Sequence, residues 1–109
     1  MKKYLAMAIL LFSANAYSEN ESTDLTKINS VISYSTYGSG DVIFKVENPS
    51  TNCYGYWINK NDMGFNANLT IIIAAYQAKN TVVAKGLTDE KWAGSSKNWC
   101  KLYSISLAS

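Results

Sequence analysis

The chain has 109 residues, a length that fits one domain, and contains neither histidine nor arginine. Its formal net charge of +2 comes from Lys2 and Lys3 in a leader-like segment, so the rest of the chain holds equal numbers of basic and acidic side chains. A balanced charge removes the electrostatic basis for binding nucleic acids or anionic membranes. The missing side chains are the usual general bases, oxyanion-stabilising groups and metal ligands. We therefore expect a non-enzymatic protein without a cofactor or a metal; a glycosidase-like carboxylate pair is the alternative, but so small a domain rarely holds a deep cleft.

Residues 1–18 have the pattern of a secretory signal peptide. Two lysines precede an apolar run from Tyr4 to Phe12, and small residues then allow cleavage after Ala16 or Ser18. The apolar run is too short to span a bilayer as a helix of the mature protein, so we expect no membrane insertion. We therefore expect a protein that is secreted or periplasmic in a Gram-negative bacterium.

Composition divides the next part of the chain into an arm and three strands. Residues 19–26 are polar and without periodicity, which predicts a flexible N-terminal arm before one domain at 27–109. β-branched and aromatic residues are enriched at 27–37, 41–47 and 53–58, which predicts three strands. Turn residues at 38–40 and a loop around Pro49 separate these strands, so we expect an antiparallel meander.

One segment, 65–79, has the periodicity of a helix. Its large apolar side chains recur at helical spacing and are predicted to pack on the core: Leu69, Ile72, Ile73 and Tyr76. A neighbouring stripe has mostly small side chains: Ile71, Ala74, Ala75 and Ala78. This small-residue face either packs closely on the sheet or lets a second copy approach, and we predict a homo-oligomer that associates through it.

Strand-like composition returns at 81–87 and 99–107, after a loop that contains Trp92. The order is therefore β-β-β-α-β-β, which predicts a mainly β protein with one helix. This order matches the oligonucleotide/oligosaccharide-binding (OB) fold, a five-stranded Greek-key barrel, with the helix between the third and fourth strands at one end. An open α+β sheet with the helix across one face is the alternative, because strand alternation does not distinguish closed from open sheets.

Cys53 and Cys100 are the two cysteines of the chain. An even pair exported to an oxidising compartment is expected to form a disulfide. The bridge would close a loop of about 48 residues and stabilise the fold by about 4 kcal/mol on the chain-entropy model. A redox-active or metal-binding thiol pair is the alternative, but no further ligand lies nearby in the sequence.

Aromatic residues gather around both cysteines in the sequence. Sugar rings bind by laying their C–H faces on aromatic planes while their hydroxyls pair with polar side chains. We therefore predict a carbohydrate site made of Trp92, Tyr54, Tyr56, Asp62, Ser95 and Ser96. Trp57 and Trp99 are expected to pack on the disulfide instead, and Trp92 lies in a Gly/Ser loop where a binding role and an anchoring role both remain open.

These features together resemble a known toxin family. The leader, a mature domain of about 90 residues, the OB-like order, the long-range disulfide and the helix Asn-Leu-Thr-Ile-Ile-Ile-Ala-Ala-Tyr-Gln-Ala-Lys are similar to those of the B subunits of five-subunit bacterial toxins, including the pertussis-like branch. The segments Trp92-Ala-Gly-Ser-Ser-Lys-Asn-Trp-Cys100 and Cys53-Tyr-Gly-Tyr-Trp57 also resemble small secreted proteins of marine gammaproteobacteria that have no assigned function.

The toxin resemblance implies a ring-forming, glycan-binding subunit with its helix at the central pore and a secreted partner subunit. The chain departs from the cholera-type pattern, because Cys53 lies at the third strand rather than near the mature N-terminus. This departure leaves ring size and ligand class open. The alternative function is that of an envelope accessory or inhibitor protein with a protein partner and no glycan ligand.

Overall fold

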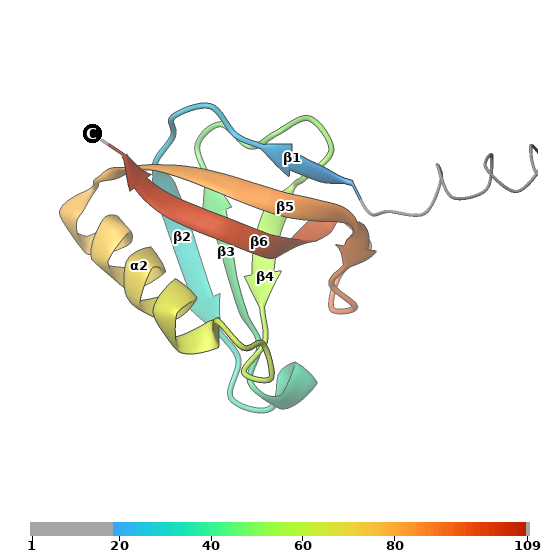
Figure 1. The fold of residues 1–109 in the computed structure, drawn as a ribbon. Helices are drawn as coiled ribbons and strands as arrows, with labels where there is room; N and C mark the ends of the chain where they lie inside the picture. Colours follow the sequence, from blue (N-terminus) through green and yellow to red (C-terminus); the bar gives the residue numbers. More distant parts are fainter. Residues whose placement is uncertain (1–18, 109) are drawn as a thin grey trace, which may run out of the picture.

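The computed structural model describes residues 19–108, so the expected signal peptide lies outside the described residues. The elements in chain order are β1 (Asn20–Ser22), β2 (Ile28–Ser33), the 3-10 turn η1 (Tyr37–Ser39), β3 (Val42–Val46), β4 (Gly55–Ile58), α2 (Phe65–Ala78), β5 (Thr81–Lys91) and β6 (Trp99–Ala108). In Figure 1, β5 and β6 run across β2, β3 and β4, and α2 lies beside β2 and β6. No helix within residues 19–108 is long and apolar enough to cross a membrane.

The strands form one six-stranded sheet in the order β1-β5-β6-β4-β3-β2. The pair β4–β6 is parallel, and every other pair is antiparallel. The prediction of a mainly β protein with one helix, placed after the meander β2-β3-β4, is confirmed. The predicted five-stranded barrel is not obtained, because the chain has an additional strand and its ladder is open, with β1 and β2 at the two edges.

The additional strand lies in the segment 19–26, for which the sequence predicts a flexible arm. β1 pairs with β5 in the register Asn20↔Leu87. Thr23 is buried, its amide donates to the Ala84 carbonyl (2.9 Å), and its Oγ1 accepts from the Ala84 amide (3.1 Å). Thr26 exchanges both backbone hydrogen bonds with Val82. The arm prediction is wrong because polar side chains here complete the hydrogen bonding of β5, which hydrophobic periodicity does not reveal.

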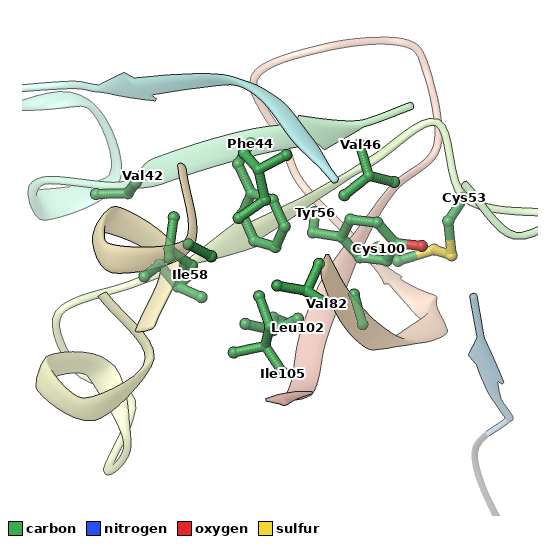
Figure 2. Close-up of a cluster of buried hydrophobic side chains, with 14 residues drawn as sticks. Val42, Phe44, Val46, Cys53, Tyr56, Ile58, Val82, Cys100, Leu102 and Ile105 are labelled. Carbon is green, nitrogen blue, oxygen red and sulfur yellow. A yellow bond between two sulfur atoms is a disulfide. The ribbon is translucent and has the colours of Figure 1, made fainter. Parts of the chain in front are cut away.

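The main core lies between α2 and the sheet. Phe44 of β3 and Tyr56 of β4 are almost fully buried and stack with ring centroids 5.4 Å apart. Figure 2 shows these rings beside the disulfide and the apolar side chains of β5 and β6. All five strands from β2 to β6, together with α2, contribute buried side chains to this cluster.

The buried face of α2 agrees with the predicted one at Leu69 and Ile72 and differs from it at the other two positions. Ile72 and Ala75 are fully buried and Ile71 packs against the core, whereas Ile73 is 46% exposed and Tyr76 is 39% exposed. The predicted small-residue face is therefore split, because Ala75 points into the core. A helix that carries two adjacent apolar stripes does not reveal which one packs, and the sheet here accepts the smaller Ala75.

The predicted disulfide between Cys53 and Cys100 is present, with the Cα atoms 5.5 Å apart. It joins the residues before β4 to the start of β6. The surroundings are closely packed, since a Cβ on Gly86 would lie 2.8 Å from both the Cys100 Cβ and the Tyr56 ring. Glycine at position 86 therefore allows β5 to pass close to the bridge.

We expect Ile72→Ala to lower the free energy of unfolding by about 2–5 kcal/mol, because it leaves a cavity in the core. Ile73→Ala removes the same atoms from an exposed position and should cost less than about 1 kcal/mol. Urea unfolding of both variants with the disulfide intact measures the difference. Equal losses would contradict this orientation of α2.

Candidate functional site

The candidate site is built around Tyr54, which lies between Cys53 and the start of β4. Its amide donates to the Asn98 carbonyl (2.8 Å), so the backbone is held by the segment that precedes β6. The disulfide fixes the neighbouring residue. The Tyr54 side chain is 38% exposed, which leaves part of its ring available to a ligand on an otherwise fixed backbone.

The Tyr54 ring packs against the Trp99 ring. The two rings meet edge to face with centroids 5.2 Å apart, and Trp99 is only 7% exposed. A side chain on Gly55 would overlap the Trp99 ring, so the glycine makes room for this tryptophan. Trp99 and Trp57 belong to a cluster with Ile43 and Trp92, whereas both cysteines belong to the main core, so the predicted packing of these tryptophans on the disulfide is not found. Trp99 instead orients the neighbouring Tyr54 ring.

Two lysine ammonium groups lie over the Tyr54 ring. Lys45 Nζ is 4.5 Å and Lys97 Nζ is 4.9 Å from the ring centroid, both within the range of cation–π contacts. Lys45 Nζ also donates to the Tyr54 hydroxyl (3.2 Å). This hydrogen bond, followed by the positive charges of Lys45 and Lys97, lowers the pKa of Tyr54 below its ordinary value.

Beside this ring lies an open groove of about 860 Å³ with polar and apolar lining residues. It runs between the end of β3, the loop that follows it and the segment before β6, and its polar lining residues are Asn29, Lys45, Glu47, Ser50, Thr51, Asn52, Tyr54, Lys97 and Asn98. The groove thus combines one aromatic face with amides, hydroxyls and ammonium groups.

Asn52 and Asn98, whose amides line the groove, are held by hydrogen bonds between distant parts of the chain. The Asn98 side-chain amide donates to the Asn52 carbonyl. Both the backbone and the side chain of Asn52 donate to the Glu21 carboxylate, at 3.0 and 2.5 Å, and these bonds lower the pKa of Glu21. Because Glu21 belongs to β1, the N-terminal strand fixes the loop that lines the groove.

Of the predicted ligand-binding residues, Tyr54 lines this groove. Ser95 and Ser96 lie in the loop that leads to it, where Ser95 Oγ accepts from the Lys97 amide (3.1 Å). Asp62 does not line the groove and forms an ion pair with Lys101 at 2.6 Å. The six residues therefore do not form one site.

Tyr56 is fully buried in the core, so the prediction that it contacts a ligand is wrong. Burial raises the pKa of its hydroxyl, which lies 3.5 Å from Ser50 Oγ. Alternation along β4 points Tyr56 to the inner face of the sheet and Trp57 to the outer face. On the outer face the Lys101 ammonium lies 3.9 Å from the centroid of the Trp57 ring.

Trp92 has the anchoring role rather than the binding role. It is only 6% exposed and its Nε1 donates to Asp41 Oδ2 (2.8 Å), a carboxylate that is itself buried. Its ring packs on Trp99 with centroids 5.9 Å apart and on Tyr34 at 5.7 Å. A side chain on Gly94 would overlap the Trp92 ring, so the glycine that suggests an exposed loop instead allows the loop to fold over the tryptophan.

The sequence prediction missed Lys45, Lys97, Asn52 and Asn98. Alternation along β3 places Lys45 on the face opposite the buried Phe44 and Val46, which was an available signal. Nothing local indicates that 97–98 meet 52–54, because this contact depends on the disulfide and the parallel pairing of β4 with β6. Within residues 19–108, no group of three or more His, Cys, Asp or Glu side chains lies close enough to hold a metal ion.

Comparisons with protein-family models, with curated proteins and with solved structures found no match for this chain.

We expect Trp92→Phe to lower the free energy of unfolding by about 1–3 kcal/mol, because it removes a hydrogen bond to the buried Asp41 carboxylate. Trp57→Phe is the matched control, since Trp57 Nε1 donates to the Glu90 carbonyl at an exposed position (3.0 Å). Its loss should be about 1 kcal/mol or less. Chemical denaturation of both proteins measures the difference, and a smaller loss for Trp92→Phe than for Trp57→Phe would contradict the anchoring role.

Proposed function

We propose that the protein is a secreted or periplasmic, non-enzymatic binding module with carbohydrate as its ligand. The observation that carries the proposal is the partly exposed Tyr54 ring beside a groove of about 860 Å³ that is lined by amide, hydroxyl and ammonium groups among others. An aromatic face accepts the C–H side of a sugar ring, and the adjacent amides and hydroxyls can pair with sugar hydroxyls.

The rigidity of the groove supports a binding role. The Tyr54 ring packs against the Trp99 ring, and the Asn52 side chain donates a hydrogen bond to the Glu21 carboxylate of β1. A site whose side chains are already ordered loses less conformational entropy when a ligand binds. This matters for sugars, which offer little apolar surface and are bound mainly through oriented polar contacts.

Strand order supports an OB-like arrangement in open form. The five strands other than β1 lie in the order β5-β6-β4-β3-β2, with the third and last of them parallel and the helix between the third and the fourth. The Thr26–Val82 bridge brings the chain just before β2 against β5, the strand near the opposite edge. This is the arrangement from which a Greek-key barrel closes.

The disulfide supports export to an oxidising compartment, where such bridges persist. The ring-forming part of the toxin resemblance has weaker support, since Ala75 is buried and Ile71 packs on the core. Self-association through α2 would have to use its exposed residues, among them Ala74, Ile73 and Tyr76.

An envelope accessory or inhibitor role with a protein partner is the second candidate. It is favoured by a groove of about 490 Å³ between α2 and β2, lined by Val31, Leu69 and Ile73 among others. Under this alternative the protein binds no saccharide, and the measurement below separates the two.

We expect the disulfide-bonded protein to bind saccharides on an array of neutral and acidic glycans. For a bound saccharide, Tyr54→Ala should raise Kd about tenfold, equivalent to about 1.4 kcal/mol, because the aromatic face is lost. Tyr103→Ala is the matched control, since Tyr103 is 59% exposed on β6 and does not line the groove; its Kd should match that of the unmodified protein.

Calorimetric titration of the three proteins gives the Kd values, and thermal unfolding shows that each variant is folded. A signal at background for every glycan on the array would refute the carbohydrate proposal. Equal loss of affinity in Tyr54→Ala and Tyr103→Ala would place the ligand elsewhere.

A further inference from the structure

The groove beside Tyr54 has a local excess of positive charge in a chain that is otherwise balanced. Lys45 and Lys97 line it, and Glu47 is the one acidic residue among the lining side chains. Among residues 19–108 the ion pair found is Lys101–Asp62, so neither groove lysine has a carboxylate within ion-pair distance. Two ammonium groups are therefore concentrated here without an anionic partner in the fold.

From this geometry we infer that the ligand is an acidic saccharide whose carboxylate or sulfate pairs with the Lys45 and Lys97 ammonium groups while a sugar ring lies against Tyr54. This inference rests on the proposed carbohydrate-binding function and names its ligand class. Carboxylate and sulfate share the chemistry required, which is a negative charge spread over several acceptor oxygens.

The positions of the two lysines favour a ligand that carries both a ring and a charge. Each Nζ lies within 5 Å of the Tyr54 ring centroid, at 4.5 and 4.9 Å. A group that contacts the exposed part of the Tyr54 ring beside these ammonium groups therefore brings its substituents within reach of both. A neutral sugar would use the ring and the amides of Asn52 and Asn98 and leave both charges to water.

Two further observations agree with this inference. The Lys45 side chain is partly buried and its ammonium donates to the Tyr54 hydroxyl (3.2 Å), which places its charge at the groove. The hydrogen bond from Lys45, and then the positive charges of Lys45 and Lys97, lower the pKa of Tyr54, which agrees with two ammonium groups at this end of the groove.

The test uses two matched pairs of probes. One pair is dextran sulfate and dextran oligomers of equal length, and the other is oligogalacturonate and its carboxyl-reduced form. Calorimetric titration should give a lower Kd for the charged member than for the neutral member in at least one pair. The pair that shows this preference identifies the acidic group as sulfate or carboxylate. Because the site is open to solvent, this preference should weaken as salt is added.

Two double variants separate a local effect from one of net charge. The double variant Lys45→Gln with Lys97→Gln should raise the Kd of the charged probe about tenfold. Each lost ion pair with the ligand contributes a factor of about three. Lys85→Gln with Lys91→Gln removes the same charge from exposed positions on β5 that do not line the groove, and should change the affinity less than twofold. Glu47→Gln should strengthen binding, because it removes the carboxylate at the groove.

The outcomes distinguish this inference from the proposed function. If charged and neutral probes bind equally and the groove double variant keeps its affinity, the acidic-ligand inference is overturned while carbohydrate binding stands. If both double variants weaken binding equally, the effect is one of net charge and the inference is also overturned. If no probe and no glycan on the array binds, the proposed function itself fails.

Discussion

The disulfide between Cys53 and Cys100 is the constraint on which the rest of the structure depends. It lies where the two parts of the sheet meet, the meander β2-β3-β4 and the hairpin β5-β6. These parts are joined by the parallel pair β4–β6, whose register covers three residue pairs, from Gly55↔Trp99 to Trp57↔Lys101. So short a parallel contact between segments far apart in sequence closes a long loop for few hydrogen bonds, and the covalent bridge offsets that entropy.

The candidate site follows from the same junction. Tyr54 adjoins one cysteine and Trp99 adjoins the other, so the bridge sets the aromatic pair that forms the floor of the site. The junction also brings Lys97, in the loop before β6, to the same Tyr54 ring as Lys45 of β3. The Cys53–Cys100 bond therefore both joins the two parts of the sheet and brings together the side chains of the proposed ligand site.

Features that depend on local pattern could be predicted from the sequence. The long strands, the helix between β4 and β5 and the disulfide follow from alternation, helical periodicity and an even cysteine count. The strand β1 was missed because it is polar, and the buried threonines that follow it, Thr23 and Thr26, serve hydrogen bonding rather than apolar packing. The orientation of α2 was predicted only in part, at Leu69 and Ile72, because both of its stripes are apolar and the shape of the sheet decides which side chains pack.

The site residues were harder to predict because their environments depend on distant partners. The Gly/Ser loop around Trp92 suggests exposure, yet the side chain is buried. It donates a hydrogen bond to Asp41, which lies 51 positions away in the sequence. Tyr56 and Tyr54 look alike in sequence, but Tyr56 lies within β4 and points into the core, whereas Tyr54 lies before the strand and lines the groove. Lysines such as Lys97 carry no sequence signal for a site until the fold places them beside an aromatic ring.

The central claim is that a ligand binds where the disulfide brings the two parts of the sheet together. Mapping of backbone amide chemical shifts, with the disulfide-bonded protein titrated with an acidic oligosaccharide, tests this most directly. We expect the largest shifts at Lys45, at 52–54 and at 97–98. Shifts concentrated instead along α2 and β2, around Leu69 and Ile73, would contradict it.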